Sequence, residues 1–462
     1  MIPYAGLNRR ILYGGSDMVR DRSAAGTAGK DDAGKAACPL ERSGMIRTVL
    51  RRKEGQERGE APGFYMIAIL LAPVYLLANY YLLRRVMGWV KAWFPFFRTA
   101  RHWALPVAVQ AFLVCSVVIA FFLPEGEFRR AMKLVGNYWL GVLLYVLLAV
   151  IAADLLRLLL GHVLPFGHIF VTTKMHRIAG CVCALVIFAA SVWGVINARV
   201  IHVTPYEVTV NKTVEGMDEM KIVLVADLHL GYNIGEKQTR QMVTKINEQD
   251  ADLVVIAGDI FDNEWEAVDK PETIAATLRG IRSNYGVYAC YGNHDIEEPV
   301  LAGFTFRQSE KKESDPRMDE FLKDANITLL RDEGTLIDGK FYLYGRPDAH
   351  RPGRGIETRK TPNEITADMD KDKPIIVLDH QPKELRELAD AGVDLDLCGH
   401  THDGQMFPGN LIIKLMWENA CGYLQKGQMH NIVTSGVGVF GPDMRVGTKA
   451  EICPITVHFT KD

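Results

Sequence analysis

Four stretches of about twenty residues without Asp, Glu, Lys or Arg constrain this chain more than any other feature. They lie at residues 64–83, 104–123, 134–153 and 178–197. A helix needs about 20 consecutive apolar residues to cross the hydrocarbon of a bilayer, and charged side chains are seldom missing from so long a helix of a soluble protein. The sequence therefore predicts an all-α region of four transmembrane helices over residues 64–197, and with it a multi-pass protein of the cell membrane.

The flanks of these stretches leave the membrane orientation open. Lys and Arg residues near the predicted spans divide ten to eight between the two sides, so they do not assign the side of the C-terminal half. Asp154 and Arg157 close the third span. Charged residues inside a membrane can mark a transport path, but the spacing and edge position of these two favour an ion pair at the interface.

The remaining composition separates the rest of the chain into parts. Residues 1–63 show no apolar periodicity up to Met45 and predict a disordered or poorly structured segment, whose translation before residue 45 stays open. The formal net charge of −2 indicates no specific nucleic-acid partner. The eight cysteines show no metal-type spacing, and Cys290 and Cys398 are expected as small apolar side chains within buried strands.

The C-terminal half alternates strand signals with helix signals, which is typical of an α/β domain. We interpret residues 198–220 as a linker and an edge strand, and residues 221–462 as one domain. Apolar runs predict strands at 221–226, 252–257, 286–291, 374–378 and 394–398. Between them, helices are expected near 236–249, 265–282 and 382–391.

Each of these five strands ends in side chains that bind metals. The clusters that follow the strands are Asp227-Leu228-His229, Gly258-Asp259-Ile260-Phe261-Asp262, Gly292-Asn293-His294-Asp295, His380-Gln381-Pro382 and Gly399-His400-Thr401-His402. Ligands gather beyond the carboxyl ends of strands in α/β sheets, and Asp, Asn and His suit borderline and hard divalent ions. One such cluster would be an ordinary polar turn, but five in the same structural position indicate one metal centre.

In this order the clusters resemble the signature of the calcineurin-like metallophosphoesterases. The run from Gly399 to Gln405 is most similar to the membrane-associated bacterial branch typified by YkuE and YaeI, although Asp403 stands where that branch usually has glycine. The resemblance covers roughly residues 205–462. It implies a two-sheet β-sandwich flanked by helices, and hence a phosphoric ester hydrolase.

The resemblance also implies two divalent metal ions, of Mn, Fe or Zn, and no organic cofactor. Asp259 would bridge the ions, with Asp227, His229 and His402 completing the ligands of the first and Asn293, His380 and His400 those of the second. Two metals about 3.5–4 Å apart can activate a bridging water, as hydroxide, and clamp both oxygens of a displacement at phosphorus.

Five further side chains receive roles beside the metals. His294 is expected to face the phosphate and to stabilise the transition state or protonate the leaving oxygen, with Asp295 orienting its ring. Asp262 either holds a ligand or a loop, or is a carboxylate at a helix N-terminus. Arg346 and Arg445 are candidates for phosphate contact.

Two classes of function are compatible with this organisation. The first is a membrane-anchored metal-dependent phosphoesterase acting on a phosphodiester or pyrophosphate bond, with a lipid-linked substrate attractive because the site is held near a bilayer. The alternative is a polytopic transporter or sensor whose soluble domain binds metal without turnover. The complete ligand set favours the enzyme.

Overall fold

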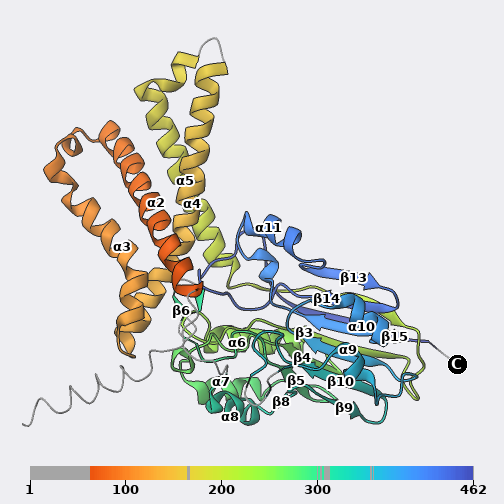
Figure 1. The fold of residues 1–462 in the computed structure, drawn as a ribbon. Helices are drawn as coiled ribbons and strands as arrows, with labels where there is room; N and C mark the ends of the chain where they lie inside the picture. The colour runs from red at the N-terminus through yellow and green to blue at the C-terminus, as the bar shows by residue number, and fades with distance from the viewer. Residues whose placement is uncertain are drawn as a thin grey trace, which may run out of the picture. The chain divides into compact units, whose positions relative to one another are not determined.

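The computed structural model describes residues 63–462 apart from 164–166, 299, 302–303, 306–312, 354–355, 357 and 461–462. Side chains are described from residue 72 onward, except for those of 300–301 and 304–305. Residues 1–62, for which the sequence predicts disorder, lie outside the described residues. Figure 1 shows a helical N-terminal region and a mixed α/β C-terminal region.

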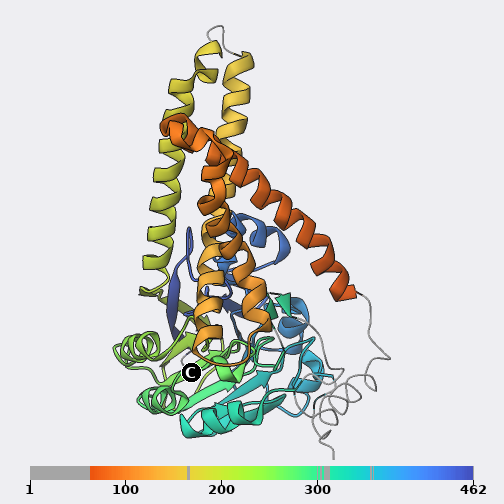
Figure 2. The same cartoon turned by 90° about the vertical axis from the view of Figure 1, so that its left-hand side faces the viewer.

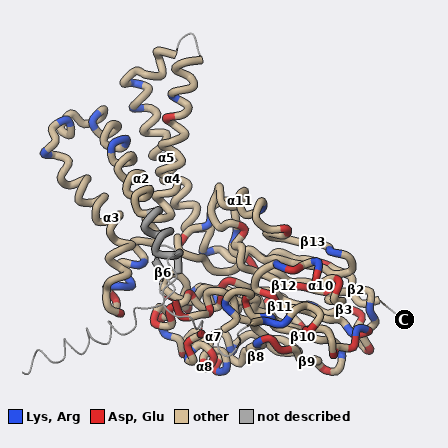
Figure 3. The backbone as a smooth tube through the Cα atoms, viewed as in Figure 1, with Lys and Arg blue, Asp and Glu red and all other residues tan. Residues whose placement is uncertain are grey.

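The N-terminal region contains four long helices, of which three match predicted spans. They are α2 (Gly63–Trp93), α3 (Ala104–Phe122), α4 (Glu127–Val163) and α5 (Thr173–Asn197), with short 3-10 turns η1 (Pro95–Arg98), η2 (Ala100–Trp103) and η3 (Gly167–Val171) between them. Within the described part of the chain, three helices are long and apolar enough to cross a membrane: Ala100–Phe122, Glu127–Val163 and Thr173–Asn197. Figure 3 shows few charged positions along α3, α4 and α5. The first predicted span lies within α2, which is not among these three.

Asp154 has a different partner from the one expected. Its carboxylate accepts a hydrogen bond of 2.6 Å from the Tyr81 hydroxyl and pairs with Arg85, both on α2. The expectation of an Asp154–Arg157 pair considered only neighbours on the same helix. Packing of α2 against α4 supplies a cation from another helix instead, so the pair ties two helices together.

The C-terminal region consists of two sheets. The first has the order β1 (Ile201–Val203), β15 (Ala450–Phe459), β3 (Glu219–Val225), β4 (Leu253–Ala257), β5 (Val287–Cys290) and β8 (Thr328–Leu329), with β2 (Tyr206–Val210) also paired to β15. The second has the order β13 (Gly422–Lys426), β14 (Met429–Val433), β12 (Leu395–Cys398), β11 (Ile375–Asp379), β10 (Phe341–Arg346) and β9 (Glu333–Ile337). A separate hairpin joins β6 (Val300–Leu301) to β7 (Phe304–Thr305).

Alternating side chains along the strands build a four-layer sandwich. Ile222 and Leu224 of β3 pack in a core shared with strands of the second sheet. The intervening Val223 and Val225 face the opposite way, into a core formed with α6 (Glu236–Asn247), α7 (Pro271–Leu278) and α8 (Pro316–Asp324). A third core joins the second sheet to α9 (Pro362–Thr366) and α10 (Leu385–Ala391). Strands that are buried on both faces are apolar along their whole length. The observed layers confirm the predicted two-sheet sandwich flanked by helices.

Helix α5 continues directly into this sandwich. The segment interpreted as a linker and edge strand contains β1 and β2, and both pair with β15 in parallel. The side-chain amide of Asn197 donates to the carbonyls of Arg445 and Thr448, at 3.1 and 2.7 Å. Arg199 pairs with Asp443, whose side chain is 1% exposed. The end of α5 is therefore part of the packed C-terminal region.

We expect Arg199→Gln to destabilise the protein, because it leaves the Asp443 carboxylate buried without its cation. Removing one partner of a buried pair costs about 3–5 kcal/mol, and partial solvent exposure of Arg199 should reduce the loss in unfolding free energy to about 2 kcal/mol. Asp443→Asn removes the charge that needs a partner. The double variant should therefore lose less than the sum of the single losses in chemical unfolding; strictly additive losses would contradict the pairing.

Candidate metal centre

All predicted ligands follow the carboxyl ends of parallel strands. Asp227 and His229 follow β3, Asp259 follows β4, and Asn293 follows β5, three strands that pair in parallel in the first sheet. The remaining ligands, His380 after β11 and His400 and His402 after β12, follow two parallel strands of the second sheet. Because the two sheets stack face to face, the two sets of strand ends meet at one edge of the sandwich.

The structure brings six of the seven predicted ligands into two of three groups of described side chains that could each hold a metal ion; the third group is His229, Asp262 and His294. One group of predicted ligands consists of Asp227, His229 and His402, and the other of Asp259, His380 and His400; within each group, one ligand atom of each residue lies within 4.8 Å of the others. Asp259 lies between the groups, with Oδ2 3.1 Å from His380 Nε2 and 3.8 Å from His229 Nε2. This position suits a carboxylate that faces two ions.

Unusual polar contacts show that these residues fit a cation. The Nε2 atoms of His229 and His402 face each other 3.1 Å apart, so at least one of them presents an electron pair. The Nδ1 atoms of His229 and His380 already face the Asp262 carboxylate and the Ala257 carbonyl, at 3.3 and 2.8 Å. Such contacts keep the proton on Nδ1 and leave Nε2 as the electron-pair donor.

Asn293 gives a second indication of the same kind. Its side-chain oxygen is buried and has no hydrogen-bond partner among the described residues. An orphaned buried acceptor is costly unless an ion or water satisfies it. A divalent cation at this edge would supply that interaction, so the donor set of nitrogen and oxygen atoms fits the ions that the resemblance implies.

The backbone of the centre adopts a conformation that non-glycine residues seldom take. Five predicted ligands have φ in the left-handed region: Asp227 at 53°, His229 at 47°, Asp259 at 50°, His400 at 74° and His402 at 51°. Such residues cost about 1–3 kcal/mol each and gather at functional sites. The tight turns aim successive side chains inward from loops that would otherwise point them apart.

Burial controls the protonation of the groups around the centre. It raises the pKa of Asp227 to about 6 and that of Asp295 to about 7, because a low dielectric disfavours the charged form. Burial alone would also raise the pKa of Asp259, but the adjacent His380 holds it well below its usual value. Burial opposes protonation of His380, yet the charge of Asp259 raises its pKa to about 10. The two form an ion pair that a metal ion would replace.

Asp295 does not orient His294, contrary to the prediction. Its carboxylate accepts hydrogen bonds from the amides of Phe261 and Gly292, at 2.8 and 2.7 Å. The His294 ring instead meets the side-chain oxygen of Asn263 through Nδ1. The turn after Gly292 directs Asp295 inward to cap free amides, so a residue from another loop holds the histidine.

The predicted phosphate contacts of Arg346 and Arg445 are also wrong. Arg346 is fully buried and pairs with Asp379 and Glu384, each at 2.7 Å. Arg445 is fully buried as well and donates to main-chain carbonyls, including those of Ser435 at 2.6 Å and Gly438 at 2.7 Å. Both arginines have structural partners for their terminal nitrogens, although the Nε atom of each is buried without a hydrogen-bond partner among the described residues.

Other side chains at the centre were either ambiguous in the sequence or missed. Asp262 contacts His229, which favours the ligand-holding interpretation over a helix N-terminus. Asp403 has a φ of 50°, a value that glycine adopts most readily and that Asp tolerates better than most residues. Phe440, which the sequence did not single out, packs its ring centroid 4.6 Å from that of His294. Asn263 had a weak signal, one position after Asp262 in the second cluster.

We expect Arg346→Ala to act on stability and not on phosphate. The change leaves Asp379 buried and negative, so the unfolding free energy should fall by about 3 kcal/mol, the lower end for a broken buried pair, since Arg359 also reaches Asp379 at 3.1 Å. Arg386→Ala, which removes an exposed arginine of α10, should change stability by less than about 0.5 kcal/mol. Weaker binding of inorganic phosphate by calorimetry, without a lower Tm, would restore the predicted contact.

Comparison with known proteins shows that this chain is similar to a family of phosphoesterases. Residues 220–404 match the family model described as calcineurin-like phosphoesterase. A Danio rerio protein named transmembrane protein with metallophosphoesterase domain is 31% identical over 288 residues, covering 60% of this chain and 62% of its own length. A Helicobacter pylori protein named uncharacterized metallophosphoesterase is 31% identical over 246 residues, covering 51% of this chain and 58% of its own. Bacillus subtilis YkuE is 26% identical over 284 residues, covering 57% and 88%.

The matches concentrate on the part of the chain that carries the metal centre. This chain spans about three fifths of the length of the first two relatives. The matched segment begins within β3 and ends after His402, so it includes every predicted metal ligand. The chain therefore contains a calcineurin-like metallophosphoesterase domain, and its relatives include YkuE and proteins named as transmembrane.

Proposed function

We propose that this chain is a multi-pass membrane phosphoesterase that uses two divalent metal ions to hydrolyse a phosphodiester or pyrophosphate bond of a lipid-linked substrate. Helix α2 would provide a fourth span beside the three apolar helices. The observation that carries the proposal is a pocket that is walled by two of those apolar helices, α3 and α4, and lined by Asp262, which contacts the predicted ligand His229.

The metal ligands divide as the two groups of side chains suggest. Asp227, His229 and His402 would hold one ion, and His380, His400 and Asn293 the other, with Asp259 between them. Two such ions supply a nucleophile from water and neutralise the charge of the phosphate. The buried carboxylates and imidazoles of the ligands would hold the two ions in place before the substrate binds.

His294 is suited to proton transfer at the phosphate. Its ring is held by Asn263 and packs against His229 and Phe440. Burial lowers its pKa to about 4, so the ring is neutral near pH 7 and can accept a proton. An anionic phosphate beside the ring would raise this pKa again, which allows the same group to protonate a leaving oxygen.

We expect Asp259→Asn and His294→Ala to fail in different ways. Asp259 bridges the ions in this scheme, so the loss of its charge should lower both metal content and rate. His294 holds no metal, so its removal should keep both ions and reduce the rate by the roughly 10²–10⁴ typical of a positioned acid or base, with a smaller loss for good leaving groups. Metal analysis beside the wild type decides this. Two ions and full rate in Asp259→Asn, or an emptied position in His294→Ala, would refute the assignment.

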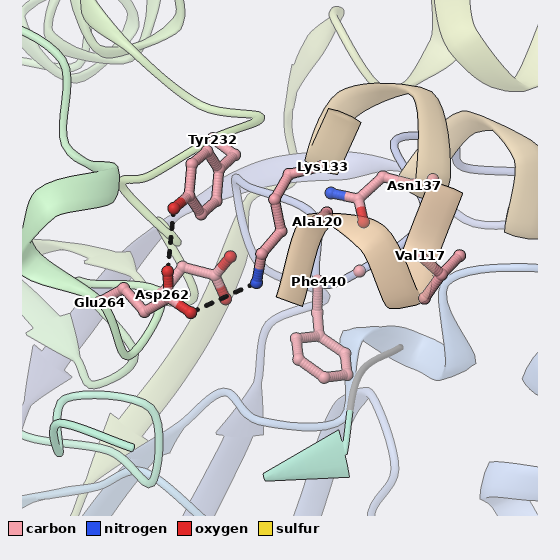
Figure 4. A pocket seen from close by; sticks show the side chains of 10 residues that line it. Val117, Ala120, Lys133, Asn137, Tyr232, Asp262, Glu264 and Phe440 are labelled. Carbon is pink, nitrogen blue, oxygen red and sulfur yellow. Dashed lines mark hydrogen bonds and ion pairs between the residues drawn. The ribbon is translucent and has the colours of Figure 1, made fainter. Parts of the chain in front are cut away.

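The pocket of about 40 Å³ lies between α4 and the loops after β3 and β4. Figure 4 shows Lys133 and Asn137 of α4 facing Tyr232, Asp262 and Glu264. The Lys133 ammonium lies 3.2 Å from a carboxylate oxygen of Glu264, whose other oxygen accepts from Tyr232 at 2.9 Å. Asp262 connects this pocket to the metal centre through its contact with His229.

Polar and charged side chains of both signs line the pocket. Lys133 of α4 faces the carboxylates of Asp262 and Glu264, and Glu264 accepts from both Arg129 and Lys133. A substrate whose phosphate reaches the metals would therefore place polar groups next to α4. A lipid-linked phosphate satisfies both requirements, because its anchor lies in the bilayer that α3 and α4 cross.

We expect the full chain, purified with Mn in lipid nanodiscs, to prefer a lipid-linked phosphodiester or pyrophosphate over a small chromogenic diester. Lys133→Ala should lower kcat/KM for the lipid-linked substrate about 10-fold more than for the small one, since hydrogen bonds to charged groups contribute about 1.5–3 kcal/mol. Lys174→Ala, which changes an exposed lysine at the start of α5, is the matched control and should alter neither value. A preference for soluble diesters, unchanged by Lys133→Ala, would refute the lipid-linked substrate.

A further inference from the structure

An unusual group of exposed apolar side chains lies next to the metal centre. Among the described residues from Ile201 onward, eight large apolar side chains are exposed. Five fall within ten positions, namely Phe407, Leu411, Ile412, Leu415 and Met416, whereas Val203, Leu336 and Tyr423 are scattered. Leu415 and Met416 are 87% and 70% exposed. A single exposed apolar residue is ordinary, but a contiguous cluster marks an interaction surface.

These side chains form one face of helix α11 (Gly409–Met416). Leu411, Ile412, Leu415 and Met416 recur at the spacing that places residues on the same side of a helix. None of the residues of α11 is buried. The helix therefore presents an apolar stripe outward that the described part of the chain does not cover.

The segment directly before α11 packs against two of the apolar helices. Directly before the helix, Met406 packs in a cluster with Tyr145 of α4 and Met444, and the Tyr145 hydroxyl donates to the Phe407 carbonyl at 3.3 Å. Side chains of α5, Ala190 and Val195, pack against the same cluster. Figure 1 labels α11, in blue, on the side of the helical region where α5 enters the sheets, and Figure 2 shows the same region turned by 90°. The segment directly before the apolar stripe thus packs against two helices that are apolar enough to span a membrane.

The residues flanking the stripe have the chemistry of a membrane interface. Trp417 follows the helix, and the Lys383 ammonium lies 5.4 Å from the centroid of its ring. Lys414 lies on α11 itself and is exposed. Tryptophan and lysine beside an apolar stripe are typical of helices that lie in the plane of a bilayer surface.

From these observations we propose that α11 inserts its apolar face into the bilayer crossed by α4 and α5. The inference rests on the proposed membrane function and deepens it, because α11 follows the metal-binding segment almost directly. His402 begins the turn η5 (His402–Gly404), which contacts α11, and the His400 ring lies 5.2 Å from that of Trp417. Insertion would hold the metal centre at the level where the phosphate groups of lipids lie.

Spin labels on the full chain in phosphatidylcholine nanodiscs test this directly. The label is placed by Leu415→Cys or, as matched control, by Leu336→Cys on β9, in a chain whose Cys38, Cys115, Cys181 and Cys421 are changed to Ser. At position 415 we expect strong broadening by oxygen, which dissolves in lipid, and loss of broadening by a water-soluble nickel complex. At position 336, which is exposed on a strand far from α11 in sequence, the nickel complex should dominate.

Two outcomes would overturn the proposal. Equal access of the nickel complex to positions 415 and 336 would show that α11 faces water. Exclusion of both reagents from position 415 would show that protein, such as a second copy of the chain, covers the stripe. Preserved metal content in each labelled variant establishes that the fold is intact.

A second variant links insertion to turnover. Leu411→Glu combined with Leu415→Glu should abolish the oxygen signal of a label at Met416→Cys and should raise KM for the lipid-linked substrate more than for the small diester. An oxygen signal that persists in this variant would overturn the proposal. If the wild type hydrolyses no lipid-linked substrate, the proposed substrate class fails, whereas the spin-label result still decides on insertion.

Discussion

The close approach of the two sheets at their carboxyl edges is the constraint on which the rest of the structure depends. A Cβ on Gly399, after β12, would lie 2.4 Å from the Cβ of Ala226, after β3. A Cβ on Gly292, after β5, would lie 2.8 Å from Cδ2 of His380, after β11 of the second sheet. Both distances are far inside van der Waals contact. Glycine at these two positions lets strand ends from different sheets meet, and only then can ligands of the second sheet reach the carboxylates of the first.

Secondary structure was predicted well where the sequence of a single strand was sufficient to define it. β4 is an apolar run that stops at a glycine, and the predicted strand at 252–257 differs from the observed Leu253–Ala257 by one residue. The helix expected over 265–282 is shorter, because the chain first wraps the metal centre and α7 begins only at Pro271, whose ring suits the first helical turn. Helix α11 was not predicted at all, since its apolar side chains face outward and no polar cap marks its start.

Partners within the candidate site were less predictable than the residues themselves. Strand-end position selects Asp, Asn and His as ligands without knowledge of any contact. Which side chain holds another depends on loops that the sequence separates widely. His294 is held by Asn263, 31 residues earlier, and not by the adjacent Asp295. Arg346 finds its carboxylates 33 and 38 residues away, so a buried arginine resembles a substrate-binding one until the fold is known.

Helix α5 and the candidate metal centre are joined by a short series of contacts. Asn197, the last residue of α5, donates to the carbonyls of Arg445 and Thr448. The Arg445 guanidinium in turn donates to the carbonyls of Ser435 and Gly438 and lies 3.3 Å from the ring nitrogen Nδ1 of His402. Because buried polar contacts of this kind are costly to leave unmade, the position of α5 and the position of a candidate ligand depend on each other. The sequence suggested a catalytic domain on a tether, whereas these contacts make the helix a structural support of the site.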